Sequence, residues 1–302
     1  MTKKKSNLPI RFCGILLAVF CFLPSTTSAG FHFGLPSAVK NKVKQLKAKK
    51  VVVNYAEEWI LVPGNSSFGT SDFYVMKYEA KNVGGMAISH ADLTPWVNID
   101  HPSAVAACAA LGAGAHLLTI AETQTINRNI EAQTSNWANG TIGSGVSTGG
   151  GLKRGNAGIT DSASYDGANP EFGTGRDVKA KLVLSNAEEI WDWSGNVWEW
   201  IYGAGAAGTL GTPEGVTFDL GGLSEWNSNS YPVLFEERAI LGPSNSSYTS
   251  LYGVGMYYGG GTTNAVIRGG RWDDGAKAGV FAFHAGNAPS NVPASLGFRC
   301  SR

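Results

Sequence analysis

Four tryptophans fall within ten residues near the middle of the chain, at positions 191–200, which read Trp-Asp-Trp-Ser-Gly-Asn-Val-Trp-Glu-Trp. Within each pair the two rings are two residues apart, which is the spacing that places side chains on one face of a β-strand. The Ser-Gly-Asn between the pairs has the composition of a turn. Rings of this size usually pack against a rigid platform. The block therefore predicts two short strands around a turn, with most of the rings in an aromatic core.

The rest of the chain favours a loop-rich body that contains β-strands. Glycine occupies 40 of 302 positions and only 16% of the residues are charged, whereas long surface helices need a charged outer face. Apolar periodicity and turn residues predict strands at 58–63, 73–79, 181–184, 189–193, 198–201, 265–268 and 295–300, and helices at 102–112 and 119–133. Residues 135–175 and 203–258 are expected to be mostly loops, and 55–302 to form one domain.

The first 29 residues have the pattern of a secretory signal peptide. Three lysines and Arg11 form a positive start, residues 12–23 form an apolar run, and small residues lead to a cleavage site after Ala29. The alternative is an uncleaved anchor, but the run is short for a bilayer, which needs about 20 apolar residues. We therefore expect an exported protein that is secreted, periplasmic or held at the cell surface.

Without the signal peptide the chain is mildly acidic, and its lysines are concentrated in a spacer at residues 30–54. Six lysines lie between Lys40 and Lys50. The spacer fits either a helix that touches an anionic cell surface or a solvated linker. Because acidic residues outnumber basic ones after residue 50, nothing in the charge pattern supports nucleic-acid binding.

Two cysteines, Cys108 and Cys300, remain after cleavage. In an oxidising compartment an even pair favours a disulfide. It would close a loop of nearly the whole domain and stabilise the fold by about 5 kcal/mol on the chain-entropy model. Two buried thiols or a catalytic cysteine are the alternatives.

The turn of the tryptophan block also carries oxygen atoms that suit a hard cation. The side chains of Asn196 and Glu199, with a backbone carbonyl such as that of Val197, could ligate calcium. The alternative is a purely structural role for the same residues.

These motifs resemble the formylglycine-generating enzyme family, also called the sulfatase-modifying-factor domain. The resemblance rests on the tryptophan block, on Ile-Arg-Gly-Gly-Arg-Trp at 267–272 and on the closing Leu-Gly-Phe-Arg-Cys at 296–300. Residues 73–79, 95–98 and 104–118 are similar to upstream parts of the family in the same order, so the resemblance covers 55–302. It implies an α+β, C-type-lectin-like fold with two short helices and small antiparallel sheets. It also implies a Cys108–Cys300 disulfide and calcium near the turn.

One departure from the family bears on catalysis. The aerobic enzymes of the family bind copper through two cysteines soon after the Arg-Gly-Gly motif, because cuprous copper needs soft thiolates. Here residues 272–279 read Trp-Asp-Asp-Gly-Ala-Lys-Ala-Gly and contain no cysteine. The sequence therefore predicts no copper and no oxidation of a substrate cysteine.

The segment 268–300 is still more similar to one subgroup, the variable proteins of diversity-generating retroelements. The constant elements of that subgroup stand at 269–281 (Gly-Gly-x-Trp-x-x-Gly-x-x-Ala-Gly-Val-Phe), at 289–290 (Pro-Ser) and at 297–299 (Gly-Phe-Arg). In such systems a reverse transcriptase randomises adenines in a copied template. The resemblance implies that 268–300 is a variable region, in which fixed residues hold the backbone and the residues between them change.

The residues between the fixed positions are the predicted contact surface: Arg271, Asp273, Asp274, Ala276, Phe283, His284, Ala285, Asn287, Asn291, Val292, Pro293 and Ala294. For each of them an ordinary surface loop is the alternative. His284 is expected to be a contact residue and not a metal ligand, because no second histidine or cysteine is close in sequence. Arg299 is expected in a buried pair with a carboxylate that the sequence does not identify.

The sequence thus predicts an exported, non-catalytic binding protein with a diversified surface. Its ligand would be a protein or glycan on another cell, a phage or a host surface. The alternatives are an envelope or adhesion protein of fixed specificity, and an enzyme related to the formylglycine-generating oxidase that lacks the copper cysteines.

Overall fold

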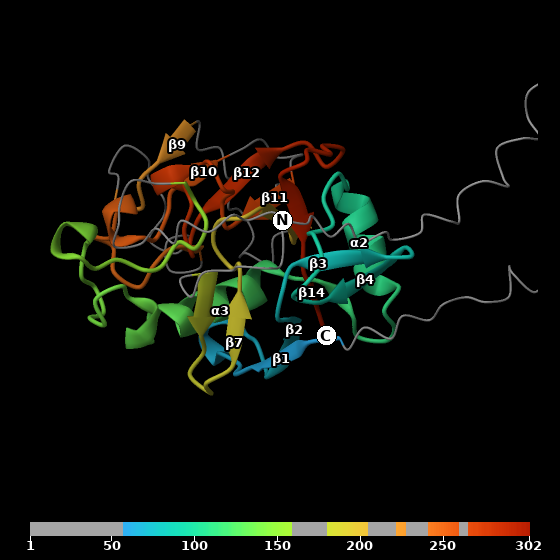
Figure 1. Cartoon of the computed structure of the whole chain (residues 1–302), viewed down its shortest axis with the longest axis horizontal. Coiled ribbons are helices and arrows are strands. Elements are labelled where there is room, and N and C mark those ends of the chain that lie inside the picture. The colour runs from blue at the N-terminus through green and yellow to red at the C-terminus, as the bar shows by residue number, and fades with distance from the viewer. Residues whose placement is uncertain (1–56, 159–179, 205–221, 228–240, 260–264) are drawn as a thin grey trace, which may run out of the picture. The chain divides into compact units, whose positions relative to one another are not determined.

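The computed structural model describes residues 57–158, 180–204, 222–227, 241–259 and 265–302 (Figure 1), all within the unit Asn54–Arg302. The predicted signal peptide, the Lys-rich spacer and parts of both predicted loop segments lie outside these residues. In the described ranges no helix is long and apolar enough to cross a membrane.

A four-stranded sheet joins the two ends of the domain. Its order is β1 (Trp59–Val62), β2 (Phe73–Met76), β14 (Cys300–Ser301) and β5 (His116–Leu117). The end of the chain is therefore an inner strand, which pairs antiparallel with β2 at Val75 and with β5 at Leu117. The blue β2 and the red end of the chain thus lie side by side (Figure 1).

A six-stranded sheet carries most of the second half of the domain. Its order is β13 (Leu296–Phe298), β8 (Trp198–Ala204), β11 (Ala265–Arg268), β12 (Phe283–Asn287), β10 (Tyr257–Gly259) and β9 (Gly222–Ser224). Two pairs, β13 with β8 and β10 with β12, are parallel, and the others are antiparallel. Two hairpins complete the described strands: β3 (Ala80–Val83) with β4 (Met86–Ser89), and β6 (Lys181–Val183) with β7 (Glu189–Trp191).

Both predicted helices are present. Helix α2 (His101–Ala109) begins at Asp100, whose side chain accepts a hydrogen bond from Ser103 N. Helix α3 (Ile120–Glu131) begins with a capping box of Thr119 and Glu122, in which each side chain bonds to the backbone of the other residue. Short 3-10 turns occur at Ser66–Phe68, Thr134–Asn136, Val146–Thr148, Ser250–Tyr252 and Gly275–Lys277. With the small sheets, these elements confirm the α+β class.

Six strands were not expected from the sequence: β3, β4, β5, β9, β10 and β12. The β3–β4 hairpin turns at Gly84 and Gly85, whose φ angles of 62° and 89° are left-handed, and this Gly-Gly pair is a recognisable hairpin signal. Strands β9 and β10 lie in a segment that was predicted to be loop. Tyr-Tyr-Gly of β10 has no distinctive alternation, and it becomes a strand because β12 and β9 pair with it on either side.

The tryptophan block divides between two sheets and does not form one hairpin. Strand β7 ends at Trp191, because Asp192 adopts a left-handed φ of 53°, and the turn before β8 contains a second left-handed residue, Asn196, with a φ of 63°. Trp193 and Trp200 are fully buried. Their indole nitrogens donate to Asn127 Oδ1 (2.8 Å) and to the Ile99 carbonyl (3.0 Å). The two rings pack in two separate hydrophobic clusters. Trp191 and Trp198 are partly exposed, so two of the four rings, and not most of them, are fully in the core.

The predicted disulfide is confirmed. Cys108 in α2 and Cys300 in β14 are bonded, with their Cα atoms 5.3 Å apart, and both are fully buried. The bond attaches the first helix to the closing strand.

Glu199 is the carboxylate that pairs with Arg299. Its Oε1 accepts from Arg299 Nε (2.7 Å) and its Oε2 accepts from Arg268 Nη1 (2.8 Å), and all three side chains are at most 1% exposed. Arg299 also donates to the carbonyls of Met76, Lys77 and Trp191. Burial lowers the pKa of Arg268 to about 10, so it stays charged at neutral pH. These hydrogen bonds compensate for removing three charges from water.

We expect Glu199→Gln to lower the free energy of unfolding by about 3–5 kcal/mol, because it leaves two guanidinium groups buried without their counter-charge. Urea denaturation would measure the loss. The matched control is Glu189→Gln, which breaks the partly exposed pair with Lys181 and should change stability by at most about 1 kcal/mol. Equal effects of the two substitutions would contradict this assignment.

Candidate functional site

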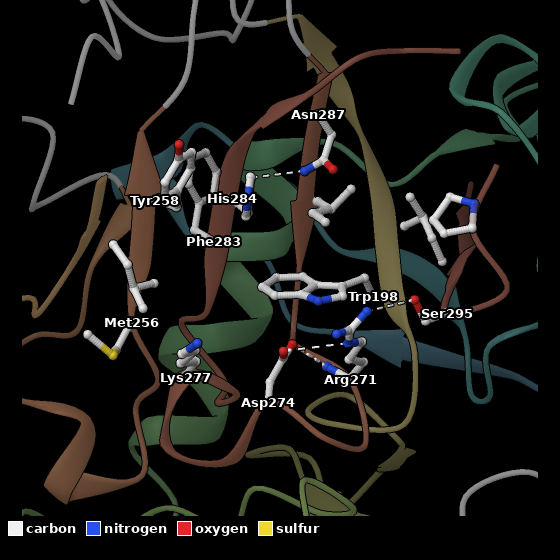
Figure 2. A pocket seen from close by; sticks show the side chains of 14 residues that line it. Trp198, Met256, Tyr258, Arg271, Asp274, Lys277, Phe283, His284, Asn287 and Ser295 are labelled. Carbon is white, nitrogen blue, oxygen red and sulfur yellow. Dashed lines mark hydrogen bonds and ion pairs between the residues drawn. The ribbon is translucent and has the colours of Figure 1, made fainter. Parts of the chain in front are cut away.

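A pocket of about 370 Å³ opens over the six-stranded sheet (Figure 2). Its walls come from strands β8 to β13 and from the segment 271–277 that follows β11. The lining residues are Trp198, Leu223, Met256, Tyr258, Ile267, Arg271, Asp274, Lys277, Phe283, His284, Asn287, Pro293, Ser295 and Leu296.

Three rings form the aromatic part of the pocket. The parallel register of β10 and β12 places Tyr258 opposite His284, and their rings stack with centroids 4.3 Å apart. Trp198, from β8, meets the His284 ring edge-on at 6.1 Å. Gly286 leaves room for the stack, because a Cβ there would lie 2.7 Å from Tyr258 Cε1 and 2.9 Å from His284 Cε1.

His284 is a neutral ring with a defined tautomer. Its Nδ1 accepts from the Gly286 N–H (3.0 Å) and lies 2.9 Å from Asn287 Nδ2. Burial lowers the pKa of His284 to about 4, so the ring carries no charge at pH 7. Because Nδ1 is an acceptor, the proton lies on Nε2. The ring can therefore donate one hydrogen bond to a ligand and stack against it, but it is not poised as a general base.

Charged groups surround Arg271 on the other side of the pocket. Arg271 Nε lies 2.6 Å from Asp273 Oδ1 and 3.6 Å from Asp274 Oδ1, and its Nη1 donates to Ser295 Oγ at 3.4 Å. Burial raises the pKa of Asp274. Lys277 also lines this side (Figure 2). The pocket thus combines an aromatic wall with donors and acceptors of both charges.

The predicted contact residues divide into three groups. Arg271, Asp274, Phe283, His284, Asn287 and Pro293 line the pocket. Asp273, Ala276, Asn291, Val292 and Ala294 are exposed beyond its lining. Ala285 was expected at the surface, and that expectation is wrong, since it is fully buried in the hydrophobic core.

The error at Ala285 has a simple cause. Residues 283–287 form strand β12, in which alternate side chains face opposite sides of the sheet. His284 faces the pocket side, while Ala285 packs inward. Phe283 is also buried, at 7% exposure, and contributes only a small part of its surface to the pocket.

Sequence reasoning missed Trp198, Met256, Tyr258 and Lys277 as pocket residues. Trp198 was assigned to the aromatic core, and its partial exposure has no local signal. Met256 and Tyr258 lie in the segment predicted to be loop, and only the pairing of β10 with β12 brings them beside His284. Lys277 directly follows the predicted Ala276, so a slightly wider window would have included it.

The predicted calcium ligands lie apart from this pocket, in the turn before β8. Asn196 Nδ2 donates to Glu79 Oε2 (2.5 Å), and Val197 N donates to Glu79 Oε1 (3.4 Å). Each oxygen of Glu199 already accepts a hydrogen bond from an arginine, so the arrangement does not fit calcium at Glu199. The described ranges also hold no group of three or more histidine, cysteine or acidic residues arranged for a metal ion. Calcium bound by other atoms of the turn stays a prediction.

A match to a family profile agrees with the sequence resemblance. The sequence profile described as the sulfatase-modifying factor enzyme 1-like domain matches residues 40–302. Among solved structures, variable protein 1 of Treponema denticola is similar at 14% identity and a TM-score of 0.38, over 82% of this chain and 92% of that chain. No curated protein matches. The predicted C-type-lectin-like form of the α+β fold is confirmed.

The partial burial of His284 predicts a pH dependence of stability. The folded pKa of about 4 lies below the ordinary value of 6.5, so between these values the unfolded chain binds more protons. The stability that the protein gains from holding this ring neutral is therefore fully present above pH 6.5 and is lost as the pH falls toward 4. We expect His284→Gln, which does not titrate, to flatten the fall in unfolding midpoint over this interval. If the unfolding midpoint of the wild type and of His284→Gln fell in parallel between pH 6.5 and 4, the lowered pKa of His284 would be contradicted.

The burial pattern predicts which positions tolerate change. Single substitutions to serine at Ala276, Asn291, Val292 or Ala294, all exposed, should alter the free energy of unfolding by less than about 0.5 kcal/mol. Phe283→Ala should cost about 3–5 kcal/mol, because the ring belongs to the core. Chemical denaturation of the five variants measures the change in the free energy of unfolding at the exposed positions and at Phe283. If the exposed positions lost as much stability as Phe283, the assignment of Phe283 to the core and of the other four residues to the surface would be wrong.

Proposed function

We propose that this chain, a member of the sulfatase-modifying factor enzyme 1-like domain family, is an exported, non-catalytic protein that binds a ligand in the pocket over its six-stranded sheet. The observation that carries the proposal is the convergence of Arg271, Asp274, His284, Asn287 and Pro293 on one pocket. In sequence these residues are separated by the constant elements of the variable-protein pattern. In space they line the same pocket.

The constant positions have steric reasons to be constant. Gly270 has a φ of 85°, and a Cβ there would lie 2.5 Å from Ala278 Cα. A Cβ on Gly279 would lie 2.3 Å from Gly255 N. Phe281 is 1% exposed. Substitution at these positions forces the backbone to move, whereas substitution at exposed Ala276 or Asn291 does not. The segment is therefore suited to change its surface without changing its fold.

This chain lacks the copper-binding cysteines that the oxidative reaction of the family needs. Copper would need a pair of free thiolates, and the chain has cysteines only at positions 13, 21, 108 and 300. Cys108 and Cys300 are bonded to each other, and the first two belong to the predicted signal peptide. In the pocket His284 is neutral, and its lining contains no cysteine to serve as a nucleophile.

The ligand class that suits the pocket is a protein side chain or a sugar on another cell, a phage or a host surface. Trp198 and Tyr258 offer rings for stacking, and aromatic anchors in pockets commonly dominate binding energy. Export would follow cleavage after Ala29, and the lysines between Lys40 and Lys50 would touch an anionic cell surface.

A binding experiment tests the pocket. Fluorescently labelled protein would be applied to a glycan array and to a panel of bacterial cells. Trp198→Ala should weaken any binding by about 30-fold or more, as expected for an aromatic anchor worth about 2 kcal/mol. Tyr202→Ala is the control, because this ring is 54% exposed and does not line the pocket. Equal binding by both variants would overturn the assignment of the pocket.

Diversification has its own test in the neighbouring DNA. A near-copy of the coding stretch for residues 268–300 should lie beside a reverse-transcriptase gene and differ mainly where the copy has adenine. If no such copy exists, diversification is refuted, and the same pocket would serve a protein of fixed specificity.

A further inference from the structure

His116, Glu122 and Ser301 form a polar cluster that the pocket does not use. His116 lies in β5, directly opposite Ser301 of β14 in the antiparallel ladder. Glu122 belongs to the first turn of α3. Ser301 and Glu122 are buried, whereas the His116 side chain is 41% exposed. The cluster therefore joins a ring that solvent reaches to buried partners on two other elements.

Both ring nitrogens of His116 face oxygen atoms. Nδ1 lies 2.7 Å from the Gly114 carbonyl oxygen. Nε2 lies 3.0 Å and 3.1 Å from the two carboxylate oxygens of Glu122. A carbonyl and an ionised carboxylate can only accept hydrogen bonds. A neutral imidazole would point a lone pair at one of these two groups, so only the doubly protonated ring satisfies both.

The hydroxyl group of Ser301 is a further acceptor for His116. Ser301 Oγ donates its single proton to Glu122 Oε2 (3.0 Å). The same oxygen lies 3.0 Å from His116 Nε2, and with its proton already used it can only accept there. Every partner of the ring is thus an acceptor.

Hydrogen bonds keep the carboxyl group of Glu122 ionised. Its Oε2 also accepts from Thr119 N (2.9 Å) and from Thr119 Oγ1 (2.8 Å). Burial acts to raise the pKa of Glu122, but the hydrogen bonds from His116 and Thr119 outweigh it and hold the pKa below its ordinary value. An ionised Glu122 in turn favours a cation beside it.

Glu122 is also the one charged group that acts on His116 among the residues that the structure describes. Elements α2 and β8 lie against β5 as well, and they bring no charged group to the ring. The hydrogen bond to Glu122 raises the pKa of His116, against the opposing effect of burial. The folded protein therefore holds this proton more tightly than the unfolded chain does.

We propose that protonated His116 is a pH-dependent latch, which fastens β14 to β5 and to the start of α3, and that loss of its proton loosens the chain at Ser301. A neutral ring places a lone pair against Gly114 or Glu122, so the ring turns away and Ser301 loses a donor. Cys300 stays held by its disulfide, which makes the opening local. The inference is independent of which ligand the pocket binds.

The direction of the pH dependence follows from the two shifts. The contribution of His116 is fully present below pH 6.5, the ordinary pKa of histidine, and is lost as the pH rises through the raised pKa of the folded state. The contribution of Glu122 is present above pH 4.5 and is lost as the pH falls through its lowered pKa. The latch is therefore closed between these limits and opens on the alkaline side.

Nitrogen NMR of the folded full chain tests the charge of the ring. The signals of His116 are assigned by their absence from His116→Gln. Both side-chain nitrogens should be protonated at pH 6.5, and the midpoint of the titration should lie above that value. A ring that is neutral at pH 6.5, or that titrates below it, would overturn the proposal.

Hydrogen exchange directly after β14 tests the loosening. The Arg302 N–H donates to the Tyr74 carbonyl (2.9 Å), and its protection reports whether this part of the chain is docked. After correction for the intrinsic pH dependence of exchange, protection should fall by about two- to fivefold as His116 loses its proton, as expected for a partly exposed ion pair. Constant protection over the same range would rule out the latch.

Three variants separate the charge from other effects. His116→Arg carries a cation throughout the experiment and should keep its protection on the alkaline side. His116→Gln carries none and should show the lowered protection at every pH. The matched control is His90→Gln, which removes a histidine outside the cluster and should retain the wild-type profile. If His116→Arg lost protection with rising pH as the wild type does, another group would control β14 and the proposal would fail.

Discussion

The paired hydrogen bonds of Glu199 to Arg268 and Arg299 hold the centre of the domain. They connect β8, β11 and the segment between β13 and β14, which are far apart in sequence. Arg299 reaches on to the carbonyls of Met76 and Trp191, and so to the first sheet and the tryptophan block. Because a buried charge is tolerated only with its partners in place, this arrangement admits few alternatives. The pocket rests on the same strands.

That rigidity explains how a changeable surface can be supported. His284 and Asn287 of β12 both line the pocket, and the pairing of β12 with β11 shifts register between them. Phe283 and Ala285, on either side of His284, pack into the core. The segment 271–277 adds Arg271 and Asp274 to the rim. Core residues and contact residues are therefore interspersed along one stretch of chain, and at residues 283–285 the alternation of the strand directs them to opposite faces of the sheet.

The sequence predicted what is encoded locally. Apolar periodicity and turn residues predicted both helices to within three residues of their bounds, and the cysteine count favoured the disulfide. What it could not predict depends on distant pairing. The partner of Arg299 lies 100 residues away at Glu199. Tyr258 joins the pocket only because β10 lies beside β12. Ala285 was misplaced because the strand that buries it had not been recognised.

Residues 296–301 lie inside the fold, with β14 between β2 and β5 and β13 beside β8. Arg299 and Cys300 supply the closing ion pair and the closing disulfide. A frameshift or a stop codon at any earlier position removes both, leaving Glu199 with only Arg268 and Cys108 with a free thiol. Only a chain that is translated in frame through residues 299 and 300 can complete these two contacts. Folding therefore depends on an intact reading frame across the segment 268–300, before any ligand is met.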